Sequence, residues 1–453
     1  MKQPHRIILL IIVIFWTGCV PRPAPISVIP NSTLKPTFTP TPKSPATQTA
    51  FLVPTASMTP SPVLSPAPIL QDCVTISSNA SQSEGTLVLE NFWWGGAVTA
   101  EYTVTSFLLD MVTQKMTTVD MPGRLIQTIG VSPDRRYLLY EYDDGSFDVN
   151  YLAVVDSKGR MVTRFPNRIP PEIWWSYYSW QAKDTLRVVI LDIDKEQVLP
   201  RLYKIDTQEY LPLKTDWQGA YAGRGPEWGL DWRAMDIHYF KGANIVYDPT
   251  LTRVVYPKQG ELVSLTDVAS GQELASTQLP KWGRLPRWSD DGEHLALIAS
   301  ADPKTAAGKD EFFIVRRDGP VFQRLTYLTE QFDTVHISDY AWSPDGKRIA
   351  FWLNTTAADP AFEGTQSELA IVEIDTGAIK RLCIEGISAP MRHEIQITHI
   401  QPVWSVDGQQ IAFAQLDSSR ANTYNVLVVD LETRTAYKVA ANKEPIGWMM
   451  KEP

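Results

Sequence analysis

The sequence predicts an all-β protein built from a repeated unit, and two observations support this. The first is composition: 34 Pro, 15 Trp and 17 Tyr in 453 residues indicate strands, because proline breaks helices and aromatic residues favour the half-buried surface of a sheet. The second is a ten-residue motif that recurs along the chain. With 44% hydrophobic residues, the chain also has enough apolar material for a large core.

The motif combines a turn with a strand. Three copies, WSDDGEHLAL, WSPDGKRIAF and WSVDGQQIAF, begin at Trp288, Trp342 and Trp404, and weaker copies lie at Val131, Trp180 and Asp248. The Ser-Pro-Asp-Gly portion predicts a tight turn, because proline fixes φ, the aspartate side chain accepts hydrogen bonds from nearby amides, and glycine adopts a left-handed backbone. The apolar run after it predicts a strand that is covered on both faces. The motif tryptophans and aspartates are therefore interpreted as packing and turn residues.

A second unit, two apolar strands around a turn such as Asp-Thr-Gly, predicts hairpins along the chain. They are expected at 106–119, 151–165, 201–213, 261–274, 312–325, 368–382 and 425–439. Together with the motif strand and a short strand before it, each hairpin makes a four-stranded sheet, the blade of a β-propeller. We expect seven blades. Six is the alternative if the first unit, which has a strand-like segment at 85–92 but no motif, only completes a neighbouring sheet.

The N-terminus has the layout of an export signal. Lys2 and Arg6 precede an apolar run at 7–16, which as a helix spans about 15 Å, half of a bilayer core of about 30 Å. Gly18-Cys19 resembles the end of a bacterial lipobox, which implies cleavage before Cys19 and diacylglycerol on its sulfur. Trp16 departs from the Leu or Val of that pattern. Ordinary signal cleavage and an uncleaved anchor remain the alternatives.

Three regions follow from these patterns. Residues 1–19 are the expected signal peptide, and residues 20–72, rich in Pro, Ser and Thr, are expected to be a disordered, polyproline II-like tether. Residues 73–453 are expected to form the propeller. This order predicts a lipid-anchored protein of the cell envelope, held in the periplasm or at the cell surface.

Charge and cysteines restrict the partners and the cross-links. A net charge of -9 argues against nucleic acid as a partner, because such binding depends on clustered positive charge. We expect a monomer. Once Cys19 is assigned to the anchor, Cys73 and Cys383 remain, and they form either one disulfide or two separate thiols.

The motif at 342–351 resembles the repeat of TolB-type propellers, a WD40-like repeat, and that of the propeller domains in prolyl oligopeptidase-like enzymes. The resemblance covers 73–453 and implies a scaffold that hosts partner binding, substrate gating or lyase chemistry. The chain departs from these families in two ways. The proline-rich tether stands where TolB has a folded N-terminal domain, and the sequence has no Gly-x-Ser-x-Gly elbow of a hydrolase.

Two sets of side chains are candidate sites. The longest insertion carries aromatic rings among charges, a combination that suits sugar or peptide recognition; its candidate residues are Trp217, Tyr221, Arg224, Trp228, Asp231 and Trp232. The alternative is that these rings form the insertion's own core. His399-Ile-Gln401 resembles a His-x-Gln element of oligogalacturonate lyases, which implies a divalent metal held with His336. Isolated, hydrogen-bonded histidines are the alternative, and we expect no cofactor.

Two functions remain open at this stage. The sequence favours a tethered, non-catalytic propeller that binds a protein or glycan ligand, because it offers no paired acid and base at an interpretable spacing. We assign no catalytic residue. The alternative is a small propeller enzyme, lyase-like or peptidase-related, with a site in the central channel.

Overall fold

A computed structural model describes residues 67–77, 83–91, 104–145, 150–166, 175–182, 184–192, 197–212, 246–258, 262–278, 286–301, 308–355, 367–384, 401–416 and 424–451. The chain divides into two units, Met1–Pro60 and Ser61–Pro453, and all described residues lie in the second. The regular structure of the described residues is almost entirely strands, with one short 3-10 turn, η4 (Leu328–Glu330). The described part contains no helix long and apolar enough to span a membrane.

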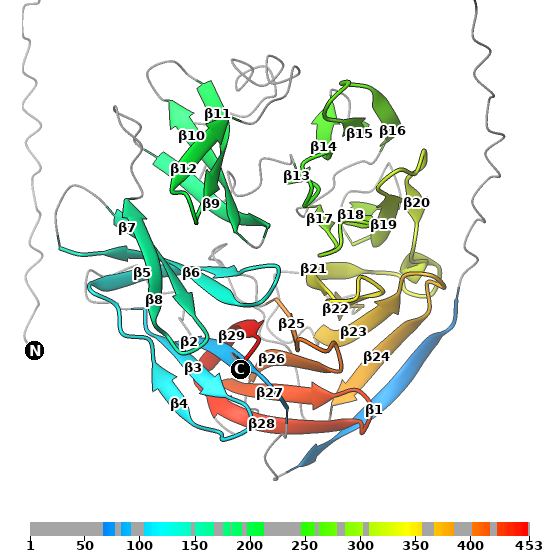
Figure 1. The fold of residues 1–453 in the computed structure, drawn as a ribbon. Coiled ribbons are helices and arrows are strands. Elements are labelled where there is room, and N and C mark those ends of the chain that lie inside the picture. Colours follow the sequence, from blue (N-terminus) through cyan, green and yellow to red (C-terminus); the bar gives the residue numbers. More distant parts are fainter. Residues whose placement is uncertain are drawn as a thin grey trace, which may run out of the picture. The chain divides into compact units, whose positions relative to one another are not determined.

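The described strands form seven antiparallel four-stranded sets (Figure 1). In pairing order, the first set consists of β29 (Lys443–Met449), β2 (Thr86–Asn91), β3 (Ser106–Asp110) and β4 (Met116–Thr118). The second set consists of β5 (Arg124–Val131), β6 (Tyr137–Asp143), β7 (Asn150–Asp156) and β8 (Met161–Pro166), and the third of β9 (Trp175–Ala182), β10 (Thr185–Asp192), β11 (Gln197–Lys204) and β12 (Glu209–Pro212). The fourth set consists of β13 (Val246–Tyr247), β14 (Arg253–Lys258), β15 (Leu262–Asp267) and β16 (Glu273–Gln278).

The other three sets contain the clearest copies of the motif. They are β17 (Arg287–Trp288), β18 (His294–Ser300), β19 (Asp310–Arg316) and β20 (Gln323–Arg324); β21 (His336–Trp342), β22 (Arg348–Asn354), β23 (Ser367–Glu373) and β24 (Ile379–Ile384); and β25 (Val403–Trp404), β26 (Gln410–Leu416), β27 (Tyr424–Asp430) and β28 (Thr435–Ala441). The expected hairpins coincide with the third and fourth strands of the sets. The fold is a β-propeller, as predicted. The number of blades stays a prediction, because segments such as 213–245 lie outside the described residues.

The turn motif forms the hydrogen bonds that its sequence predicts. In the copy at Trp342, the Ser343 hydroxyl donates to the Asp345 carboxylate (2.5 Å) and accepts from the Arg348 amide (2.9 Å). The Gly346 amide closes the turn on the Ser343 carbonyl oxygen (2.9 Å). Equivalent Ser and Asp contacts recur at Ser132, Ser289 and Ser405. In these four copies the turn thus leads the chain into the second strand of its set with the same hydrogen bonds.

A repeated tryptophan contact joins four of the described sets to the preceding one. The indole N–H of the motif tryptophan donates to a main-chain carbonyl on the first strand of the preceding set. The pairs are Trp180 to Gly130 (2.8 Å), Trp288 to Val246 (3.3 Å), Trp342 to Arg287 (2.9 Å) and Trp404 to Ala341 (3.1 Å). The motif tryptophans therefore satisfy their own polar atom while they pack between sheets.

The apolar core lies between consecutive sets. Every residue of β22 after Arg348 is buried, because neighbouring sets cover both of its faces. Phe351 meets Phe312 of the preceding set edge to face, with ring centroids 5.1 Å apart, and Trp352 meets Phe413 of the following set in the same way at 5.6 Å. The consecutive apolar residues of the motif strand are thus explained by burial on two sides.

The two ends of the propeller region make pairings that the local pattern does not predict. β29, near the C-terminus, pairs with β2 and supplies the first strand of the set that lacks a turn motif (Figure 1). β1 (Ile69–Ser77) runs parallel to β24 through Val74 and then parallel to β28. The predicted tether boundary at residue 72 is therefore wrong, because β1 begins at Ile69 and pairs with the sheet from there. Residues 1–66, with the predicted signal peptide and most of the tether, lie outside the described residues.

Two glycines provide a matched test of how tightly consecutive sets pack. Gly377 and Gly271 close equivalent hairpin turns with φ of 68° and 69°. A Cβ at Gly377 would lie 2.8 Å from the Leu325 carbonyl oxygen of the preceding set, whereas a Cβ at Gly271 would meet nothing within 4 Å. Gly271→Ala should cost about 1–2 kcal/mol from backbone strain alone. Gly377→Ala should cost on the order of 1–3 kcal/mol more, because the neighbouring set must shift.

Urea denaturation of both full-length variants measures the difference. Equal destabilisation would show that consecutive sets are not in close contact at this turn.

Candidate functional site

The first strands of all seven sets line one cavity of about 640 Å³. Each of β5, β9, β13, β17, β21, β25 and β29 contributes at least two residues to its wall. The cavity is therefore the central channel expected of a propeller. It is the one place where residues from all seven described sets meet.

The tryptophans at the cavity wall have their ring faces inside the protein. Trp448 and Trp404 are 0% and 2% exposed, and Trp342 is 6% exposed. Their indoles pack between sheets, so these rings offer no open face for stacking. Trp180 is half-buried. A ligand in this cavity would therefore be held mainly by the polar groups and by aliphatic surface such as Ile446.

Arg135 enters the cavity from a strained turn. It stands in its copy of the motif where Gly346 stands in another, and it adopts the same left-handed backbone, with φ of 59° against 66°. A non-glycine residue held in that region costs on the order of 1–3 kcal/mol. Its guanidinium donates from Nη1 to the Trp404 carbonyl oxygen (2.8 Å). The turn thus places a cation where a glycine would leave open space.

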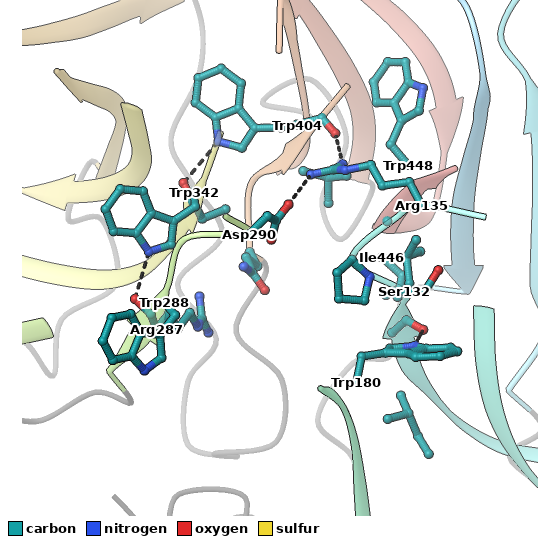
Figure 2. Close-up of a pocket in the computed structure, with 18 of the residues that line it drawn as sticks. Ser132, Arg135, Trp180, Arg287, Trp288, Asp290, Trp342, Trp404, Ile446 and Trp448 are labelled. Atoms are coloured by element: carbon teal, nitrogen blue, oxygen red, sulfur yellow. Dashed lines mark hydrogen bonds and ion pairs between the residues drawn. The ribbon is translucent and has the colours of Figure 1, made fainter. Parts of the chain in front are cut away.

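Asp290 faces Arg135 from another set. It replaces the proline of the motif, and its Oδ2 lies 3.6 Å from Nη2 of Arg135 (Figure 2). The Asp290 side chain is 38% exposed, and desolvation by the surrounding wall raises its pKa above its ordinary value, an effect that Arg135 only partly offsets. Burial also lowers the pKa of Arg135. The two departures from the motif therefore meet as one ion pair between sets that are not consecutive in the chain.

The other polar side chains at the wall support the main chain around it. Arg287 forms an ion pair with Asp339 (2.9 Å) and also bonds the Tyr340 carbonyl oxygen. Gln401 donates to that same oxygen (3.1 Å). Gln181 donates to the Asp248 carbonyl oxygen (2.6 Å) and links the β9–β12 set to the β13–β16 set. Hydrogen bonds and an ion pair among its own polar groups thus stabilise the wall.

Most of the site residues predicted from the sequence lie outside the described residues. These are Cys19, His399 and the aromatic insertion residues Trp217, Tyr221, Arg224, Trp228, Asp231 and Trp232. Their roles stay predictions. Arg135 and Asp290 were not among the residues predicted from the sequence, although each departs from a motif position that other copies keep.

His336 and Gln401 are described, and the structure does not bring them to one site. Gln401 lines the cavity, whereas His336 begins β21 and places its Nδ1 3.8 Å from Oδ2 of Asp310. Within the described part of the chain, no three His, Cys, Asp or Glu side chains lie together as metal ligands. The predicted metal site also required His399, so it stays untested.

No family model matches the sequence, and no curated protein matches it. Solved structures with a similar fold include the β-propeller domain of the Trilobed protease from Pyrococcus furiosus, with 13% identity, a TM-score of 0.47, and coverage of 81% of this chain and 95% of that one. An oligogalacturonate lyase from Vibrio parahaemolyticus is similar at 11% identity, a TM-score of 0.44, and coverage of 79% and 86%. TolB from Acinetobacter baumannii is similar at 13% identity, a TM-score of 0.38, and coverage of 86% and 98%. TolB and other propellers are thus among the structures that this chain resembles, as the motif predicted. Likeness at this level says nothing about activity.

The raised pKa of Asp290 predicts a specific pH dependence. The pKa of an aspartate is about 3.9 in the unfolded chain. If folding raises that pKa, the aspartate adds less to the free energy of unfolding as the pH rises from about 3.9 through the folded-state pKa. Asp290→Asn removes this titration. The variant should therefore compare more favourably with wild type at pH 7 than at pH 3, as measured by urea denaturation of the full chain.

Asp345→Asn is the matched control, and its stability relative to wild type should change with pH in the opposite direction. Burial alone would raise the pKa of Asp345, but hydrogen bonds from the Ser343 hydroxyl and the Lys347 amide hold it below its ordinary value. Wild type gains stability from Asp345 above its folded pKa and loses it as the pH falls. Asp345→Asn should thus be more harmful at pH 7 than at pH 3. The same sign for both variants would contradict the assigned environment of Asp290.

Proposed function

We propose that this chain is an exported, lipid-anchored β-propeller that binds a segment of a protein partner in its central cavity without catalysing a reaction. The observation that carries the binding role is the cavity itself. Seven sets supply its wall, and cross-braced polar groups hold that wall, so the site is preformed. A preformed site loses little conformational entropy when a ligand binds.

The chemistry of the wall favours a peptide segment over a glycan. Arg135 and Asp290 offer one positive and one negative group, and Ile446 beside them offers aliphatic surface. A polypeptide carries hydrogen-bonding groups, charges and apolar side chains that match all three. A sugar would instead require open aromatic faces for stacking. The rings of Trp342, Trp404 and Trp448 are buried, which leaves Trp180 as the half-buried tryptophan in the described wall.

The proposal that the protein is not an enzyme rests on the carboxylates that line the cavity. The described lining contains two carboxylates, Asp290 and Glu444. Asp290 is in an ion pair, and Glu444 is buried with a partner of its own. General acid–base catalysis needs groups that reach a substrate in the correct protonation state. If the alternative enzyme exists, Asp290 is the acid that it would use, because its pKa is raised in a cavity.

Anchoring is supported by the order of the N-terminal segments. An apolar run, Gly18-Cys19 and a proline-rich stretch precede β1. A thioether-linked lipid at Cys19, reinforced by a second acyl chain, would hold the chain on a membrane. The proline-rich stretch would then separate the propeller from the surface.

Cys19→Ser tests the anchor in cells that produce the full chain. The variant should move from the membrane fraction to the soluble fraction or accumulate uncleaved, because the sulfur that accepts the lipid is gone. Fractionation and N-terminal mass measurement report both outcomes. Unchanged membrane partition with an unchanged N-terminus would reject the lipid anchor.

A peptide array and a glycan array, probed with the full chain, test the binding role. We expect peptide ligands whose affinity falls at least tenfold in Ile446→Lys, because a cation then occupies the cavity beside Arg135. Val112→Lys, on an exposed residue outside the cavity, should leave that affinity unchanged.

Two results would contradict this proposal. Glycan ligands without peptide ligands would replace the partner class. Turnover of a bound compound, lost in Asp290→Asn, would establish the enzyme alternative.

A further inference from the structure

Two cysteines that are far apart in the sequence face each other across a strand pair. Cys73 lies on β1 and Cys383 on β24, and the parallel register of these strands places them directly opposite one another. Cys73 is exposed and Cys383 is half-buried, and the two sulfurs are not bonded here. The sequence alone left open whether these residues meet.

The register satisfies the distance that a disulfide requires. Adjacent paired strands lie about 4.7–4.9 Å apart, and disulfide-bonded cysteines have Cα atoms about 4.4–6.8 Å apart. Directly opposite residues also project to the same face of a sheet. On β1 that face is the outer one, because the neighbouring residue Val74 is buried in the apolar core and Cys73 is exposed.

The neighbouring Cys383 thiol also affects the chemistry of Cys73. It raises the pKa of the Cys73 thiol above its ordinary value, with desolvation and Asp72 adding effects in the same direction. A thiol with a raised pKa is a poor nucleophile at neutral pH. Closure of the pair should therefore be faster at alkaline pH. It also needs an oxidant, because forming one disulfide from two thiols removes two electrons.

We propose that Cys73 and Cys383 form a disulfide that fastens β1 to β24. β1 is the first described strand after the proline-rich segment, and it joins the outer edges of the β21–β24 and β25–β28 sets. Much of it is exposed, with Leu70 at 52% and Ile76 at 54%. A covalent bond at its centre would hold this exposed strand against β24.

The reaction is a thiol–disulfide exchange with a disulfide-containing oxidant. One cysteine thiolate attacks the oxidant's sulfur, which breaks the oxidant's S–S bond and forms a mixed disulfide. The second cysteine attacks the sulfur of the first and releases the remainder of the oxidant. Two S–H bonds of the protein are lost, one S–S bond forms, and the oxidant is reduced to two thiols. In cells this inference rests on the proposed export, because cytosolic thiols are kept reduced.

The test uses the full chain with Cys19→Ser, so that Cys73 and Cys383 are the remaining cysteines. Oxidised glutathione is added to the reduced protein, free thiols are alkylated, and peptides are mapped by mass spectrometry. We expect a loss in mass of two hydrogen atoms and one cross-linked peptide pair. Hydrogen exchange at 69–77 should slow at least tenfold on oxidation, because β1 can no longer separate from β24.

The register control is Cys73→Ser with Thr75→Cys. Thr75 is exposed on the same strand, but it lies opposite Thr435 on β28. A cysteine at this position lies two residues, or roughly 6.6 Å, beyond the position of Cys73 along β1. It is therefore too far from Cys383 to form a disulfide and should remain glutathionylated or free. Two results would contradict the proposed disulfide: glutathione bound separately to Cys73 and to Cys383, or disulfide formation in the control variant to the same extent. Unchanged hydrogen exchange after closure would overturn its role in holding β1.

Alkylation of the full chain directly from cells separates this inference from the proposed location. A pair that closes with glutathione but is isolated reduced would overturn the proposed export and leave the strand geometry standing. A pair isolated as a disulfide supports both.

Discussion

Burial on two faces is the constraint on which this structure depends. The motif strands are apolar along their whole length, so a four-stranded set exposes two hydrophobic faces and is not stable alone. Each set must therefore pack between two others. The motif tryptophans direct this packing, because an indole has a large apolar surface and one N–H that must find an acceptor. Trp342 and Trp404 both place that donor on the preceding set.

The same constraint explains the behaviour of the chain ends. A stack of two-faced sets has to close on itself or cap its ends. Here β29 pairs with β2, so residues near the C-terminus complete the set that begins near the N-terminus. β1 then covers the outer edges of β24 and β28, which would otherwise leave unpaired main-chain groups. The proposed disulfide would act at this second junction.

The candidate site arises where the repeat is imperfect. Three copies of the turn have glycine at the one position and three have proline at the other, and neither residue has a side chain with acid–base or charged groups. Arg135 and Asp290 occupy such positions, so their side chains enter the cavity while the turns keep their shape. Leu251 has the same left-handed backbone at the equivalent turn position, with φ of 60° against 59° for Arg135. What distinguishes Arg135 is therefore its guanidinium, which lines the cavity and pairs with Asp290.

The sequence by itself determined the repeated unit. Turn chemistry and hydrophobic pattern are local, so they predicted the motif turns, the hairpins and the all-β propeller, and the alternation of motif and hairpin predicted four strands per set. Only the tertiary structure decided which strands from distant segments lie side by side. The pairing of β29 with β2, the meeting of Arg135 with Asp290 and the register of Cys73 with Cys383 join residues that are hundreds of positions apart, or in different repeats. No local pattern records such contacts, because they depend on how two-faced sheets close around a common centre.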